Sequence, residues 1–186
     1  MKIIKLLILL LVSCSLSAKA GVVKISGSLK QFGLDRVSMN SDGIAAEVYH
    51  DRTIEIILDS NGRFDLKLKL KQPAYYKVGH NTLYLTPGDD LEIIFNRNTT
   101  KTTFNGKGIE ANNYLRNSAK LSGWEIAKIG RELNEFGLPK EKVSFEVYRY
   151  KVDSIVDASL DALAHLTAVT PEFQELEQIR LEACRL

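Results

Sequence analysis

Cysteine, histidine and long hydrophobic runs are scarce in this 186-residue sequence, and each shortage excludes a class of protein. Only Cys14 and Cys184 are present, and Cys14 lies in the N-terminal leader, so a framework of internal disulfides is excluded. The histidines, His50, His80 and His165, stand at no metal-ligand spacing from a second histidine, cysteine or glutamate, so we expect no metal site. After the N-terminus, no apolar stretch approaches the roughly 20 residues of a membrane-spanning helix.

An excess of positive charge is also missing. The formal net charge is +2, and loss of a leader that carries two or three lysines leaves 0 or −1. Nucleic-acid binding depends on many lysines and arginines that neutralise phosphates on one face, so we expect no nucleic-acid partner. The sequence has no Gly-x-Ser-x-Gly elbow, which leaves hydrolase chemistry without support. No pattern in the sequence indicates a cofactor.

The first 20 residues have the order of a signal sequence. Lys2 and Lys5 precede an unbroken apolar run over Leu6–Val12, and small and polar residues end in Ala18-Lys19-Ala20. We therefore expect residues 1–20 to be a signal peptide or lipoprotein leader. The protein is then exported to the periplasm or outer membrane of a Gram-negative-type envelope.

Two processing routes for this leader are open. Leu11-Val12-Ser13-Cys14 matches a lipobox, in which Cys14 receives the lipid and becomes the first mature residue. The other route is cleavage after Ala20, which discards Cys14. We favour the lipobox, which makes Cys14 the candidate lipidation site and attaches the protein to a membrane through its lipid.

Residues 21–106 have the pattern of β-structure. Phe64, Leu66, Leu68 and Leu70 alternate with charged residues, as in a strand with one buried and one solvated face, and Asp59-Ser60-Asn61-Gly62 is a tight-turn signal. Many short strands at this spacing predict an antiparallel β-sandwich domain. Besides the strand over residues 64–70, we expect strands at Val22–Leu29, Arg36–Asn40, Ala45–His50, Thr53–Leu58, Tyr75–Gly79, Thr82–Leu85, Leu91–Asn96 and Thr102–Phe104.

Residues 107–186 have the pattern of a helical connector. The predicted fold class is therefore α+β, with an N-terminal antiparallel β-sandwich followed by a helical segment. The spacing predicts helices over Ile109–Leu121 and Lys140–Val169, with Pro139 in the first turn of the second. The second helix has one face formed by residues spaced three or four apart. They are Tyr148, Val152, Ile155, Ser159, Leu163 and Leu166.

A third helix is expected to start at Thr170-Pro171, with Thr170 as N-cap. Its predicted apolar face is Phe173, Leu176 and Ile179. The sequence ends inside this helix, which suggests a chain cut short, although natural chains also end on helices. Cys184 falls in the same helix, and we interpret it as a small buried hydrophobic residue, with an intermolecular disulfide as the weaker alternative.

Three further patterns allow both a functional and a structural interpretation. Asp89, Asp90 and Glu92 could bind a cation, but Pro87-Gly88-Asp89-Asp90 between two strands favours a β-turn. Gly106-Lys107-Gly108 before a helix weakly resembles a phosphate-binding loop, and we favour a simple bend. Five aromatic residues could line a groove between helices, and we favour core positions for them. They are Trp124, Phe136, Phe145, Tyr148 and Tyr150.

Three stretches of the sequence together resemble a known protein family. They are Lys71-Gln72-Pro73-Ala74-Tyr75-Tyr76-Lys77-Val78-Gly79, Leu83-Tyr84-Leu85-Thr86-Pro87-Gly88-Asp89-Asp90-Leu91 and Phe104-Asn105-Gly106-Lys107-Gly108-Ile109-Glu110-Ala111-Asn112-Asn113-Tyr114-Leu115. The chain resembles the N-terminal part of TlpA-like thiol-disulfide oxidoreductases of the envelope. In that family a leader precedes a β-sandwich, a helical connector and a thioredoxin-fold domain with a Trp-Cys-x-x-Cys active site.

The resemblance implies a non-catalytic accessory module whose partner is a thioredoxin-like domain, in the same chain or a separate one. Disulfide exchange needs an attacking and a resolving thiol, so no catalytic residue carries over to this chain. The alternative is a free-standing envelope lipoprotein that binds a peptide or glycan through an exposed patch of Tyr75, Tyr76 and Tyr84. Tyr75 and Tyr76 face opposite sides of a strand, so at most one of those two joins the patch.

Overall fold

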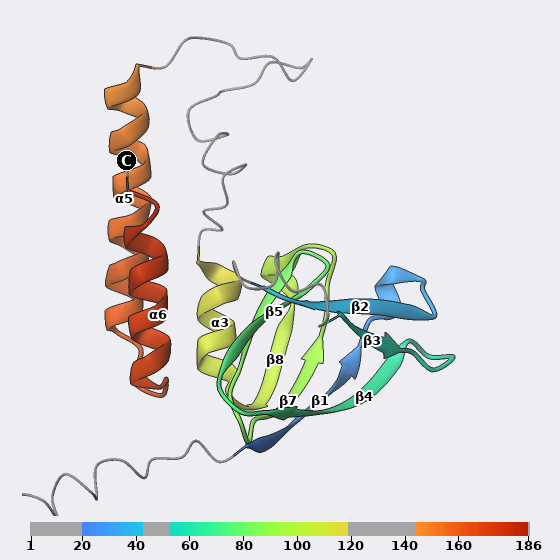
Figure 1. The fold of residues 1–186 in the computed structure, drawn as a ribbon. Coiled ribbons are helices and arrows are strands. Elements are labelled where there is room, and N and C mark those ends of the chain that lie inside the picture. Colours follow the sequence, from blue (N-terminus) through green and yellow to red (C-terminus); the bar gives the residue numbers. More distant parts are fainter. Residues whose placement is uncertain (1–19, 43–52, 119–143, 186) are drawn as a thin grey trace, which may run out of the picture.

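The protein is an α+β molecule with two four-stranded sheets and three α-helices in the residues that the structure describes (Figure 1). The structure is a computed structural model, and it describes residues 20–42, 53–118 and 144–185. The strands are β1 (Gly21–Ser28), β2 (Arg36–Ser41), β3 (Thr53–Ile57), β4 (Arg63–Leu70), β5 (Ala74–Val78), β6 (Asn81–Leu85), β7 (Asp90–Ile94) and β8 (Thr103–Lys107). The helices are α3 (Ile109–Asn117), α5 (Phe145–Ala164) and α6 (Pro171–Glu182), with 3-10 turns η1 (Lys30–Phe32) and η3 (Thr99–Lys101).

The two sheets have the strand orders β4-β1-β7-β8 and β3-β2-β5-β6. Every described strand pair is antiparallel except β1 with β7, which run parallel, with Ile25 opposite Leu91. The expectation of a wholly antiparallel arrangement is therefore wrong for this pair. Alternation along a single strand shows which face is buried, but it does not show the direction of a neighbouring strand.

The two sheets share one hydrophobic core, which follows from the alternation in their strands. Phe64 and Leu70 are buried and Leu66 and Leu68 are partly buried, while the charged residues between them are exposed, as the sequence predicts. The fully buried members of this core come from both sheets. Those with no more than 1% exposure are Val23, Leu29, Met39, Val78, Leu83, Leu85, Leu91, Ile93 and Phe95.

The turn between β3 and β4 is confirmed, and its geometry explains its sequence. The Asp59 carboxylate accepts hydrogen bonds from the backbone N–H groups of Asn61 and Arg63, both at 2.8 Å. Gly62 has a φ of 72°, and a Cβ at this position would lie 2.7 Å from the Cα of Lys30. Only glycine fits a positive φ this close to another backbone segment.

The helices begin and end at residues suited to those positions. The Ser144 hydroxyl accepts a hydrogen bond from Val147 N–H, so α5 begins at Phe145, and it ends at Ala164 rather than at the predicted Val169. Thr170 caps α6 as predicted and accepts from Phe173 N–H at 3.2 Å. The predicted strand over residues 45–50 and the Pro139 position lie outside the described residues.

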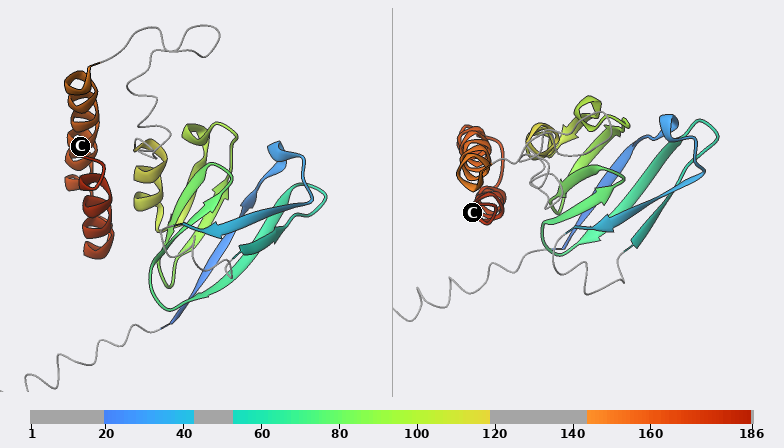
Figure 2. Two further views of the ribbon diagram at one scale, coloured as in Figure 1. Left: turned by 45° about the horizontal axis from the view of Figure 1, so that its top comes forward. Right: turned by 90° about the horizontal axis from the view of Figure 1, so that it is seen from above.

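A second hydrophobic cluster joins the helices to β6 and lies outside the core between the sheets. Figures 1 and 2 show α3 between the strands and the α5–α6 pair. The predicted α5 stripe is confirmed, because Val152, Ser159 and Leu163 are buried and the other three members pack partly buried against the cluster. Its buried apolar residues are Tyr84, Ala111, Tyr114, Leu115, Val152, Val156, Leu163, Phe173 and Leu181.

Candidate functional site

The aromatic residues of β5 and β6 form the contact between the sheet and α6. Tyr75 and Tyr84 are cross-strand neighbours whose ring centroids lie 4.9 Å apart. Phe173 of α6 packs on Tyr84 at 4.8 Å and meets Tyr114 of α3 edge-on at 5.9 Å. We call Tyr75, Tyr84, Tyr114 and Phe173 the aromatic cluster. Such packed rings contribute roughly 0.5–1.5 kcal/mol per pair beyond the area they bury.

The proposed exposed patch of tyrosines is therefore absent from the described surface. Tyr84 is only 2% exposed beneath α6, and Tyr76 is 4% exposed in the core between the sheets. Tyr75 and Tyr76 do face opposite sides of β5, as the alternation requires. Because α6 covers the outward-facing tyrosines, these three residues do not present a platform for stacking a sugar.

A buried carboxylate in α6 holds the aromatic cluster in place. The Glu177 side chain is fully buried and accepts a hydrogen bond from the Tyr75 hydroxyl at 2.8 Å. Arg180 donates to both oxygens of the same carboxylate, at 2.9 and 2.7 Å. A buried carboxylate is costly unless it is paired and hydrogen-bonded, and both conditions are met here. We call Tyr75, Glu177 and Arg180 the polar anchor.

The sequence-based assignment of the buried face of α6 is right for Phe173 and wrong for Leu176 and Ile179. Leu176 is 39% and Ile179 is 60% exposed, whereas the buried residues are Phe173, Glu177 and Leu181. These three follow a spacing of four along the helix, which puts them on one face. A glutamate at the centre of that face breaks the hydrophobic pattern. The sequence did contain one indication that Glu177 is buried. Arg180 lies three residues after it and can pair with its carboxylate on the same side of the helix.

Burial of three tyrosine hydroxyls makes alkaline stability a test of this contact. Burial raises the pKa of Tyr84 and of Tyr114 to about 12, from an ordinary value of 10.0. Burial also raises the pKa of Tyr75, and the neighbouring Glu177 carboxylate raises it further. Above pH 10 the unfolded chain loses these protons while the folded chain keeps them. Stability should therefore fall as pH rises from 10 to about 12, by at most about 1.4 kcal/mol per pH unit for each tyrosine.

Circular dichroism across an alkaline titration measures this loss, and phenolate absorbance should rise together with unfolding. Tyr150, with 75% exposure and no place in the cluster, supplies the control. Tyr150→Phe should leave the alkaline transition where it is, whereas Tyr114→Phe should reduce its steepness. A transition of equal steepness in both variants would show that the buried tyrosines do not cause it.

Asn112 fixes α3 against the free edge of β6. Its side-chain carbonyl accepts from Tyr84 N–H at 2.9 Å, and its amide donates to Tyr84 C=O at 2.9 Å. The same amide donates to Gly108 C=O, so the fully buried side chain is well satisfied. An edge strand normally leaves its backbone groups open to pairing with another chain. Asn112 satisfies two of those groups on β6 and so positions α3.

Glu110 connects α3 to the turn between α5 and α6. Its carboxylate accepts from Thr167 N–H at 3.1 Å and from Ala168 N–H at 2.7 Å. Hydrogen bonds from backbone N–H groups to a carboxylate are stronger than those between neutral groups. Together with the polar anchor, this contact fixes the α5–α6 pair at two points.

A groove of about 1060 Å³ runs between α3 and α5. On the α3 side it is lined by Ile109, Asn113 and Tyr114, and on the α5 side by Ile155, Ala158 and Ala162, among others. The small α5 residues open the groove, and its lining is mainly apolar. Its volume lies at the upper limit of ordinary ligand pockets, which span roughly 300–1,000 Å³. We call it the α3–α5 groove.

The turn residues Asp89 and Gly108 occupy the position where a phosphate would bind before α3. Gly108 has a φ of 95°, and a Cβ there would lie 2.8 Å from the Asp89 carboxyl group. Asp89 N–H donates to Thr86 C=O at 3.0 Å, which confirms the predicted β-turn, and the Asp89 side chain accepts from Thr86 N–H at 2.7 Å. Burial raises the pKa of the Asp89 carboxyl. Gly106-Lys107-Gly108 is therefore a bend that lies against a carboxyl group, which is unfavourable for an anion.

The remaining candidate residues do not assemble into a reactive site. Within the described ranges no three histidine, cysteine or acidic side chains lie close enough to hold a metal ion. His165 is exposed and its ring Nδ1 lies 2.7 Å from Asp161 C=O, while His80 lies in the turn before β6. Cys184 is half-buried beside the helical cluster, and its thiol donates to Arg180 C=O at 3.3 Å. Cys14 and His50 lie outside the described residues.

The aromatic residues of α5 are not all core residues. Phe145 is 61% and Tyr150 is 75% exposed, so the prediction of core positions is wrong for both. Tyr148 packs against the helical cluster, as predicted. Trp124 and Phe136 lie in the part of the chain that the structure does not describe.

No family model, curated protein or solved structure matches this chain. Among the helices that are described, none has the length and apolar character needed to cross a membrane.

Proposed function

We propose that this chain is an exported, non-catalytic accessory module of a TlpA-like envelope disulfide oxidoreductase. In this proposal residues 21–106 form a β-sandwich, residues 107–186 form the helical connector, and Cys14 carries the lipid. Its partner is a thioredoxin-like domain, in the same chain or a separate one. With Cys14 acylated, Cys184 is the one remaining thiol of this sequence, and disulfide exchange requires a second, so the proposal assigns no redox chemistry to the module itself.

The observation that supports this proposal best is the fixed attachment of the α5–α6 pair. Glu177 and Arg180 on α6 join Tyr75 on the sheet, and Glu110 on α3 joins the turn after α5. A connector that is held at two points keeps a defined direction relative to the sheets. Positioning a partner domain requires such a connector, whereas a freely rotating helix pair would serve only as a spacer.

Two measurements test this function. The purified 186-residue protein should show no thiol-disulfide reductase activity towards insulin, and measurable activity would contradict the proposal. The intact mass of the native protein, taken from its own cells, should exceed that of the 186-residue chain or reveal a thioredoxin-like partner that copurifies with it. Acylation of Cys14 should add the mass of the lipid to the same spectrum.

A second candidate function is peptide binding by a free-standing envelope lipoprotein. The α3–α5 groove favours it, because an open groove with apolar walls can accept apolar side chains of an extended or helical segment. Glycan binding, the other form of this alternative, lacks the exposed tyrosine patch on which it depended. A native mass equal to that of the processed chain, with no copurifying partner, would favour this second function.

A further inference from the structure

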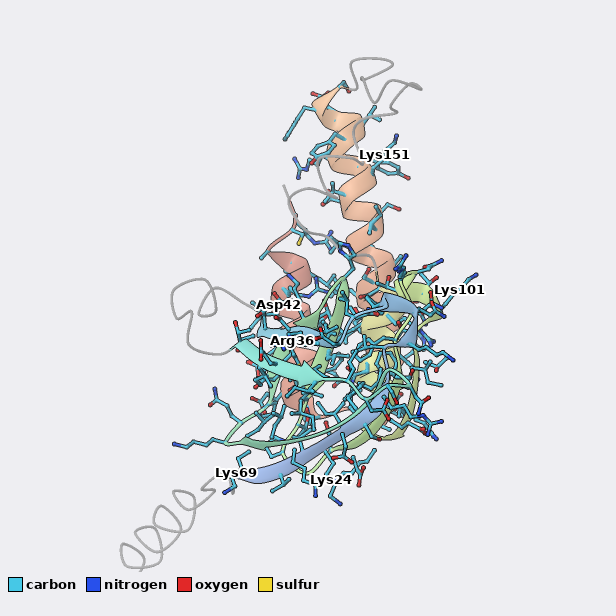
Figure 3. All side chains as sticks on the ribbon, turned by 90° about the vertical axis from the view of Figure 1, so that its right-hand side faces the viewer. Lys24, Arg36, Asp42, Lys69, Lys101 and Lys151 are labelled. Carbon is cyan, nitrogen blue, oxygen red and sulfur yellow. The ribbon has the colours of Figure 1, made fainter. Side chains whose placement is uncertain are left out.

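Lysines gather on the outer face of the sheet β4-β1-β7-β8, at the end where β1 begins. Lys24 on β1 lies directly opposite Lys67 on β4, and Val22 lies opposite Lys69. The three lysines are exposed, and Val22 is 46% exposed although it is hydrophobic. Figure 3 shows Lys24 and Lys69 on the same side of the molecule, close to the point where the described chain begins. We call Val22, Lys24, Lys67 and Lys69 the lysine face.

The charge on this face is poorly neutralised by the protein. Lys24 pairs with Asp90 at 3.5 Å, with both side chains more than half exposed. Among the described residues, neither Lys67 nor Lys69 has an ion pair. Like charges directly opposite each other on neighbouring strands destabilise a sheet, so the Lys24–Lys67 placement has a cost that an external anion would relieve.

Apart from Asp90, which is opposite Lys24, the acidic residues of the same sheet face lie further along the strands. Asp65 on β4 and Glu92 on β7 are both opposite Ser26, two residues beyond Lys24. The positive charge is therefore confined to the end of the sheet where the chain enters β1. Lys71, which is exposed directly after β4, extends it.

The lipidation site brings this end of the sheet close to a bilayer. If Cys14 carries the lipid, seven peptide units separate it from Gly21, and they span at most about 25 Å. Stable membrane attachment commonly combines an acyl chain with a basic patch that binds anionic lipids.

We propose that the lysine face binds the anionic phospholipid headgroups of the membrane to which the chain is attached. This inference rests on the proposed function, because that function supplies lipidation at Cys14. Lysine ammonium groups contact the lipid phosphates, and Val22 lies at the interface. The α5–α6 pair packs through Tyr75 and Tyr84 on the other sheet, β3-β2-β5-β6, and it lies beyond α3 from the strands (Figures 1 and 2).

Vesicle binding by residues 15–186, which lack both the apolar leader and the acylated cysteine, tests the face without its lipid. Sedimentation with phosphatidylcholine vesicles that contain phosphatidylglycerol should show binding that weakens with added salt, and pure phosphatidylcholine should show little. The double substitution Lys67→Gln with Lys69→Gln should weaken binding about 25-fold, or about fivefold per lysine. The matched control is Lys101→Gln with Lys151→Gln, which removes two exposed lysines elsewhere (Figure 3) and should leave binding nearly unchanged.

Three results would overturn the inference. One is an equal loss of binding in both double variants, which would mean that only net charge matters. Another is equal binding to both kinds of vesicle. The third is unchanged vesicle binding together with self-association of the Lys67/Lys69 variant, which would assign these lysines to protection of the edge strand β4. Thermal unfolding of both variants confirms that each is folded.

Failure of this inference is distinguishable from failure of the proposed function. A native chain without lipid, combined with lysine-dependent vesicle binding, would refute lipidation and still support headgroup binding by the lysine face. A lipid on Cys14, combined with binding that does not depend on Lys67 and Lys69, would refute the lysine face alone.

Discussion

Replacing Phe173 by alanine is expected to lower the free energy of unfolding by about 3–5 kcal/mol. The ring is fully buried between Tyr84 of the sheet and Tyr114 of α3, so its removal leaves a cavity where three elements meet. Denaturation by guanidinium chloride measures the loss. Hydrogen exchange should show that the amides of α6 lose protection first, because their helix then has fewer contacts with the sheet.

The neighbouring apolar residues of α6 provide the matched control. Leu176→Ala and Ile179→Ala remove side chains that are 39% and 60% exposed, so each should change stability by no more than about 0.5 kcal/mol. Comparable losses in all three variants would mean that α6 buries the face that the hydrophobic pattern suggests, and that the contact with Tyr84 is not made.

The strands are the part of the fold that the sequence predicts well. In β4 hydrophobic and charged residues alternate, which determines the side of the strand that faces the core. The Asp59–Gly62 turn limits where the strand can begin. Both signals are local, so neighbouring residues are sufficient to read them. The parallel pairing of β1 with β7 is not local, because the two strands are far apart in the sequence. Their pairing depends on the path of the chain between the two sheets.

The helical part was harder to predict, because its buried face is not wholly apolar. α6 buries Glu177 and exposes Ile179, which is possible only because Tyr75 and Arg180 satisfy the carboxylate. Tyr75 lies 102 residues away along the chain, so no periodicity within α6 could reveal it. Buried polar residues of this kind are where pattern-based prediction is expected to fail.

The candidate site was predictable only in part. The sequence correctly favours a turn at Asp89 and a bend at Gly108, since turn residues act through local backbone geometry. The α3–α5 groove could not be foreseen, because it depends on the separation of two helices that Glu110 and Asn112 position through distant backbone groups.

The polar anchor is expected to respond sharply to a substitution that removes its carboxylate. Glu177→Leu keeps the volume but leaves the Tyr75 hydroxyl without its acceptor and Arg180 without its partner. The loss should be about 2–3 kcal/mol, less than for a wholly buried ion pair, because the Arg180 side chain is 37% exposed and can reach water. Thermal and chemical denaturation measure it, and Glu175→Leu, an exposed glutamate of the same helix, serves as control.

A double-mutant cycle separates the hydrogen bond from the packing of the helix. Tyr75→Phe alone should cost about 1 kcal/mol, because it removes one hydrogen bond from a carboxylate that Arg180 still satisfies. In the Glu177→Leu background the same change should cost almost nothing, since the hydroxyl has already lost its acceptor. If Tyr75→Phe costs the same in both backgrounds, the two side chains do not interact. The fixed attachment of the α5–α6 pair, on which the accessory function depends, would then lose its main support.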